Sequence, residues 1–118
     1  MVIAANIAVA LVALLHLYFM VLEMYFWDKS LGRRAFGLTP EFAAASKSLA
    51  ANQGLYNGFL AAGLVWGLLP GDGGHAIKLF FLGCVVIAGI FGAVTANKKI
   101  LFVQALPGAV AMGLVLAS

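Results

Sequence analysis

A chain of 118 residues has room for a single domain, and here 64% of the residues are hydrophobic and 9% are charged. The mean hydropathy of +1.08 excludes an ordinary soluble domain, because a fold of this size cannot bury so much apolar surface. The net charge of +3 does not indicate nucleic-acid binding, since the basic residues are dispersed and form no stripe with interleaved aromatic residues. The composition predicts an all-α integral membrane protein with one domain over residues 1–118.

Four apolar segments follow one another, each close to the ~20 residues that cross a bilayer as a helix. They cover about residues 2–27, 50–69, 76–96 and 100–116. The first is not expected to be a cleaved signal peptide, because it lacks a basic flank and charged "DKSLGRR" follows it. The sequence therefore predicts four transmembrane helices.

Two local signals refine these helices. Thr39, Pro40 and Glu41 supply an N-cap, a proline for the first helical position and an acid for the first turn. The second helix is therefore predicted to begin at residue 40, with a short extension before the apolar part. Pro107 predicts a kink in the fourth helix, because proline cannot donate a backbone hydrogen bond to Val103.

The basic residues predict the orientation. Loops between the segments carry them unequally: Lys29, Arg33, Arg34 and Lys47 in the first, Lys78 in the second, and Lys98 and Lys99 in the third. Basic loops stay on the cytoplasmic side of a membrane. We therefore expect a multi-pass protein of the bacterial inner membrane with the first and third loops in the cytoplasm and both termini outside.

In this topology, polar side chains from all four helices share the cytoplasmic end. On the second helix, Asn52, Gln53, Tyr56 and Asn57 cover an arc of about 140°, while Gly54, Gly58 and Ala62 form a ridge of small residues on the opposite side. Amides in membrane helices often only bond across helices, at about 0.6 kcal/mol each. However, a few polar side chains next to a largely apolar surface are also typical of ligand pockets. The predicted ligand-binding residues are Glu23, Asn52, Gln53, Tyr56, Asn57 and Gln104.

His16 lies deeper in the first helix, seven residues from Glu23, or about 10 Å along the axis. This spacing places both side chains on one stripe, where they form a candidate proton relay. A structural histidine bonded to a neighbouring helix is the plain alternative, and a haem or metal role for His16 is a third. No metal site and no cofactor are expected, and no motif of a known catalytic site appears.

The leading hypothesis is a polytopic inner-membrane protein that binds a small amphipathic or lipid-like molecule near the cytoplasmic leaflet. Whether it also acts on that molecule as an enzyme is left open, and no catalytic residue is assigned. One alternative is a small proton-coupled exporter that uses Glu23 and His16 across a dimer. Another is a purely structural or assembly role in the membrane.

Assembly is suggested by ridges of small residues, which let helices approach closely in lipid. Besides Gly54–Gly58–Ala62, they are Gly89–Ala93 with Ala88–Gly92 on the third helix and Ala109–Gly113 on the fourth. Packing within one subunit can use two ridges that face each other, which leaves at least one for a neighbour. Because homo-oligomers favour closed symmetry, a homo-dimer or homo-trimer is expected.

Several stretches resemble one family of small bacterial inner-membrane proteins with four helices and unknown function. They are Glu23 with Trp27 (E-x-x-x-W), "NQGLYNGFLAAGL" (N-Q-G-x-Y-N), "FFLGCVVIAGIFG" and "VQALPG", so nearly the whole chain takes part. Gly108 stands where alanine would be expected. The resemblance implies the architecture and the inner-membrane location, and it carries no activity. In layout alone, the chain is also similar to the small multidrug exporters, although their carboxylate lies in the middle of the first helix.

Overall fold

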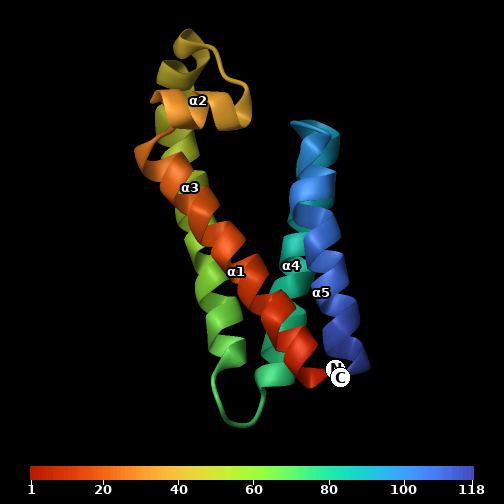
Figure 1. The fold of residues 1–118 in the computed structure, drawn as a ribbon. Coiled ribbons are helices and arrows are strands. Elements are labelled where there is room, and N and C mark those ends of the chain that lie inside the picture. The colour runs from red at the N-terminus through yellow and green to blue at the C-terminus, as the bar shows by residue number, and fades with distance from the viewer. The chain divides into compact units, whose positions relative to one another are not determined.

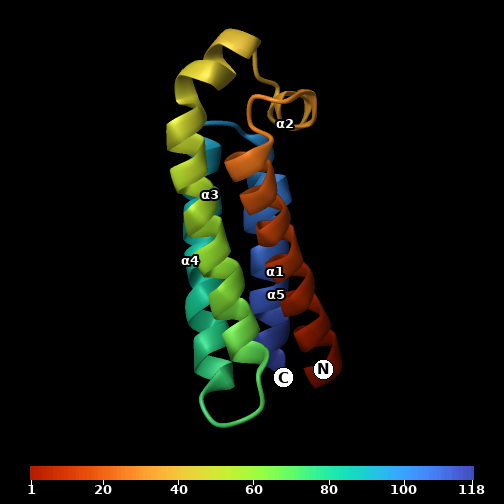
Figure 2. The ribbon, with the colours of Figure 1, turned by 90° about the vertical axis from the view of Figure 1, so that its left-hand side faces the viewer.

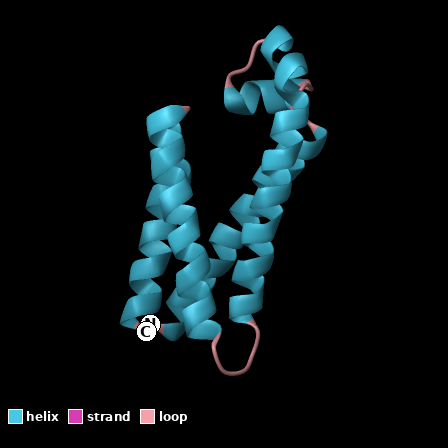
Figure 3. Ribbon diagram, turned by 180° about the vertical axis from the view of Figure 1, so that it is seen from behind, coloured by secondary structure: helices cyan, strands magenta, loops and turns pink.

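The computed structural model describes residues 1–118, all of whose regular elements are helical (Figure 3). In chain order they are α1 (Val2–Tyr25), α2 (Ser30–Phe36), α3 (Pro40–Leu68), α4 (Gly74–Thr95), the π-helical turn η1 (Leu101–Ala105) and α5 (Leu106–Ala117) (Figure 1). The all-α prediction is confirmed. One of the five α-helices, α2, lies in the first loop, where the sequence predicted no helix.

The ends of α3 and α4 follow from local chemistry. The hydroxyl of Thr39 accepts a hydrogen bond from the Phe42 backbone N–H at 3.2 Å, so the predicted N-cap is formed and α3 begins at Pro40. After α3, Gly71 and Gly73 adopt φ of +125° and +89°, which only glycine enters without strain. These two glycines turn the chain directly into α4.

The predicted irregularity near Pro107 takes the form of a π-helical turn. The backbone N–H of Leu106 donates to the carbonyl of Leu101, five residues earlier, and Pro107 then opens the first turn of α5. The proline lacks an N–H. In the wider turn immediately before it, the N–H of Leu106 bonds to the carbonyl five residues earlier instead of the one four residues earlier. Apolar helix thus continues on both sides of the proline.

The chain forms two compact units. One consists of Met1–Leu14 with Leu60–Ser118, and the other is Leu15–Phe59. Both α1 and α3 contribute to both units, because each runs across a boundary between them. In the second unit, the later half of α1 and the earlier half of α3 run side by side (Figures 1 and 2).

The unit of residues 1–14 and 60–118 has an apolar core. Its buried side chains are small or branched: Ala5, Val9, Val12, Ala13, Leu64, Leu82, Val85, Ala111 and Val115. Helix α4 packs along η1 and α5, and the backbones approach closely at Gly89, where a Cβ atom would lie 2.8 Å from the Ala105 backbone nitrogen. The absence of a side chain at Gly89 therefore sets how close the two segments come.

Two helices, α1 and α4, are long and apolar enough to cross a membrane, by length and composition. Their most apolar windows have mean hydropathies of 2.3 and 2.4, and 28% and 17% of these windows is buried. Large apolar side chains such as Ile87 and Val94 are 70% and 80% exposed. These properties indicate association with a membrane. The stretch Leu101–Ala117 is apolar but shorter, and spans through it and through α3 stay predictions.

Candidate functional site

A buried carboxylate and a buried amide meet between α1 and α3. The side-chain amide of Asn57 donates a hydrogen bond to Oε1 of Glu23. The two residues are 5% and 8% exposed, and both belong to the unit of residues 15–59. A buried charge is tolerated when it is paired or hydrogen-bonded, and Asn57 supplies that bond. The structure therefore brings together two of the residues that the sequence predicts to bind a ligand.

Glycines on α3 let this contact form. A Cβ atom at Gly54 would lie 3.0 Å from Cβ of Glu23 and 2.7 Å from Cγ of Met24. One turn further along, a Cβ atom at Gly58 would lie 2.9 Å from the sulfur of Met20. Gly54 and Gly58 of the ridge thus pack against α1 within the same unit, whereas Ala62, its third member, is exposed. Asn57 lies on this packed side of α3, whereas the helical angles had placed it on the side opposite the ridge.

His16 is fully buried two turns before Glu23 on α1. Its ring meets the ring of Phe19 edge to face, with centroids 5.5 Å apart. Seven residues are nearly two turns, so His16 and Glu23 lie along one side of α1, and the deeper position of His16 in the membrane stays a prediction. Both members of the candidate relay are therefore shielded from solvent, and the relay itself stays a prediction.

The remaining predicted ligand residues lie in different surroundings. Asn52 and Gln53 are exposed on α3, and Tyr56 is 50% exposed with its ring 6.1 Å from that of Phe59. Gln104 belongs to the other unit, where its amide donates to the backbone carbonyl of Val85 at 3.1 Å. Gln104 thus makes the helix-to-helix hydrogen bond that was the plain alternative for membrane amides.

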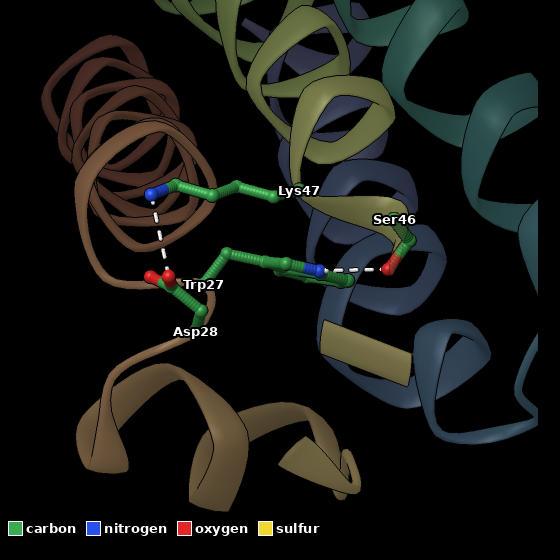
Figure 4. Close-up of polar contacts among 4 residues, drawn as sticks. All are labelled: Trp27, Asp28, Ser46 and Lys47. Carbon is green, nitrogen blue, oxygen red and sulfur yellow. Dashed lines mark hydrogen bonds and ion pairs between the residues drawn. The ribbon is translucent and has the colours of Figure 1, made fainter. Parts of the chain in front are cut away.

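A second polar group, which the sequence did not single out as a site, joins the first loop to α3 (Figure 4). The indole nitrogen of Trp27 donates to the hydroxyl of Ser46 at 3.0 Å, and that hydroxyl donates to the Phe42 carbonyl at 2.6 Å. Beside them, Lys47 and Asp28 form an ion pair at 3.2 Å. Ser46 carries no sequence signal beyond its position about two turns into a predicted helix, and the sequence indicated Lys47 only as a basic residue of the first loop.

One further polar contact lies at the opposite end of α1. The ammonium group of Lys78 on α4 donates to the side-chain oxygen of Asn6 at 2.9 Å. A charged group in an apolar helix needs such a partner, and Asn6 is the one amide in the first turns of α1. No group of three or more His, Cys, Asp or Glu side chains is arranged to hold a metal ion.

Together these features define a small all-α protein with two helices suited to a membrane and a buried carboxylate–amide pair between α1 and α3. The chain belongs to the family described as "Protein of unknown function (DUF1304)", which matches residues 10–116. It is similar to the uncharacterized protein YpaA of Lactococcus lactis subsp. lactis (strain IL1403), with 31% identity over 96 residues, 80% of this chain and 81% of that protein. No solved structure matches the chain significantly.

Proposed function

We propose that the protein spans the inner membrane and binds a small amphipathic molecule beside Glu23 and Asn57. The observation that carries this proposal is the buried carboxylate of Glu23 near the end of a largely apolar helix. Placing an ionisable group inside a membrane helix is costly, and such groups mark binding sites or ion paths. A role in packing alone would be met by an apolar side chain at lower cost.

The surroundings of Glu23 fit a ligand with a polar head and an apolar body. The carboxylate and the Asn57 amide offer an acceptor and donors, and Met20 and Met24 lie beside them. Methionine side chains are flexible and adapt to ligands of irregular shape. The exposed side chains of Asn52, Gln53 and Tyr56 on the same part of α3 are available to extend the site.

The orientation is part of the proposal. With α1, α3, α4 and the segment of η1 and α5 each crossing the membrane, the excess of basic residues in the first and third loops favours a cytoplasmic location for both. The polar end of α1 then faces the cytoplasmic leaflet, and both termini lie outside. The ligand would enter from that leaflet.

Mass spectrometry of lipids and metabolites that co-purify with the protein tests the proposal. We expect a molecule that is retained by the wild type and lost from Glu23→Gln and Asn57→Ala. Thr95→Val serves as the control, because the Thr95 hydroxyl only bonds back to the Phe91 carbonyl of its own helix, at 2.7 Å. If nothing co-purifies and Asn57→Ala changes stability alone, the pair serves packing and the protein has a structural role.

The burial of both His16 and Glu23 on one helix favours a second candidate, a proton-coupled exporter. In that case the two side chains would exchange protons as substrate binds. Adding candidate substrates to the solubilised protein should then release protons, and Glu23→Gln should abolish the release. An equal response in the wild type and in Glu23→Gln would eliminate this candidate.

A further inference from the structure

The short helix α2 is fixed firmly within the unit of residues 15–59. Gly32 on α2 is buried against the end of α1, where a Cβ atom would lie 2.9 Å from Cα of Trp27. The Trp27 ring packs against Phe36 of α2 with centroids 4.9 Å apart, and its nitrogen is bonded to Ser46 of α3. Trp27 thus ties α2 to both longer helices, and the side chains on α2 have defined positions.

Helix α2 lies crosswise to the adjoining parts of α1 and α3 (Figures 1 and 2). If α1 crosses the membrane, α2 at its end lies parallel to the membrane surface, as interfacial helices do. Exposed apolar side chains accompany it: Leu31 is 45% exposed, Tyr25 64% and Phe42 56%. Aromatic side chains of this kind gather at the level of the lipid headgroups.

The cations of this segment are not neutralised by the chain. Asp28, the acidic residue nearest to them in the sequence, is already paired with Lys47 (Figure 4). The hydrogen bond from Lys47 holds the pKa of the Asp28 carboxyl below its usual value. Lys29, Arg33 and Arg34 form no ion pair. In addition, Nε of Arg33 is buried and has no hydrogen-bond acceptor. A buried donor without an acceptor is costly, and an acceptor supplied from outside the chain would relieve that cost.

We propose that Arg33 and Arg34, assisted by Lys29, bind the phosphate group of an anionic membrane lipid. A guanidinium group matches phosphate oxygens with paired donors. The exposed side chains of Leu31, on the same helix as the arginines, and of Tyr25, at the end of α1, favour a phosphate that is attached to a lipid over one in solution. This inference rests on the membrane location in the proposed function, and it is independent of any ligand at Glu23.

Native mass spectrometry of the full-length protein in detergent, titrated with phosphatidylglycerol or phosphatidylcholine, tests the inference. The wild type should prefer the anionic lipid, and Arg33→Gln/Arg34→Gln should weaken that binding by about fivefold for each charge removed, or about 25-fold in all. The matched control, Lys98→Gln/Lys99→Gln, removes the same charge from the loop before η1 and should bind as the wild type does. Excess inorganic phosphate should not displace the lipid.

Equal binding of phosphatidylglycerol by the wild type and the double arginine variant would overturn the inference, as would an equal loss in the lysine control. Displacement by inorganic phosphate would overturn the lipid as the ligand. If the double variant does not fold, Arg34→Gln, at an exposed position, should still lower the affinity for phosphatidylglycerol about fivefold. An unchanged affinity would count against the inference.

Arg33→Lys keeps the charge but removes Nε–H, so it should also weaken binding. Co-purified ligand of Glu23, measured in the same samples, reports separately on the proposed function.

Discussion

Asn57 on α3 donates its side-chain amide to the carboxylate of Glu23 on α1, across 34 positions of the sequence. This hydrogen bond joins the two long helices of the unit of residues 15–59 at a point where both side chains are buried. In surroundings of low polarity such a bond is stronger than in water, and the cost of leaving either group without its partner rises equally. The stability of the unit of residues 15–59 therefore depends on whether Glu23 keeps its hydrogen bond to Asn57.

Removal of the amide should expose this coupling. Asn57→Ala leaves the buried carboxylate without its donor, and we expect the free energy of unfolding in detergent to fall by roughly 1–3 kcal/mol. Glu23→Gln should cost less, because a neutral amide is cheaper to bury than a carboxylate. A double-mutant cycle measures the pairwise coupling. A coupling energy near zero would contradict the importance of the bond.

The sequence predicted that Glu23 and Asn57 lie at the same depth, because helix spacing and topology determine depth. It could not predict that they touch, since the rotation of one helix against another depends on packing. That rotation follows here from Gly54 and Gly58, which admit Met24 and Met20 of α1 and thereby turn Asn57 toward Glu23. The sequence also could not predict the hydrogen-bond partner of Gln104, because that partner is the backbone carbonyl of Val85 and every residue has such a carbonyl.

The contact between Trp27 and Ser46 should control how firmly α2 is held. Trp27→Phe keeps an aromatic ring against Phe36 but removes the hydrogen bond, and Ser46→Ala removes the acceptor. Each should cost about 1 kcal/mol and speed tryptic cleavage after Arg33 and Arg34. Trp66→Phe, at a position that is 58% exposed, is the control. Cleavage at the wild-type rate in both variants would show that other contacts hold α2.

Local sequence signals predicted the start of α3 but missed α2. Thr39 and Pro40 act on the turn that they begin, so their effect can be read from the sequence alone. The segment of α2 is only seven residues long and has no apolar periodicity, and helices of that length depend on tertiary contacts. Here those contacts come from Trp27 and Gly32. The π-helical turn before Pro107 was likewise predicted only as an irregularity, because its form depends on how α4 packs against it.

Close packing between α4 and η1 should make Gly89 intolerant of any side chain. In Gly89→Ala, the new methyl group would meet the Ala105 backbone, which cannot move aside as a side chain can, and we expect a loss of about 1–3 kcal/mol. Gly113→Ala meets nothing within 4 Å and should be neutral or stabilising by up to about 1 kcal/mol. Thermal unfolding followed by circular dichroism compares the two. Equal stabilities would show that the helices can separate slightly without cost.

The proposed orientation can be tested independently of function. In a Cys84→Ala background, Ser30→Cys should be protected from a membrane-impermeant thiol reagent in intact cells, because the first loop is expected in the cytoplasm. Asp72→Cys, in the loop between α3 and α4, should react. Asp72 is preferable to Gly73, whose φ of +89° would strain a cysteine. The reverse labelling pattern would place the Glu23 site and the lipid-binding cations on the outer side.

If the protein forms the expected homo-oligomer, we propose that the small residues of α5 contribute to the interface. Gly54 and Gly58 pack against α1, and Gly89 packs against η1, so these glycines are used within one chain. A Cβ atom at Gly113 would meet nothing within 4 Å, and Ala109 on the same side of α5 is exposed. Gly113→Leu should therefore shift a dimer or trimer toward monomer, whereas Gly58→Leu should mainly lower stability by displacing Met20. Mass photometry of the wild type and both variants gives the subunit number. A monomeric wild type at working concentration would leave this side of α5 to lipid, and any ligand site would then form within one chain.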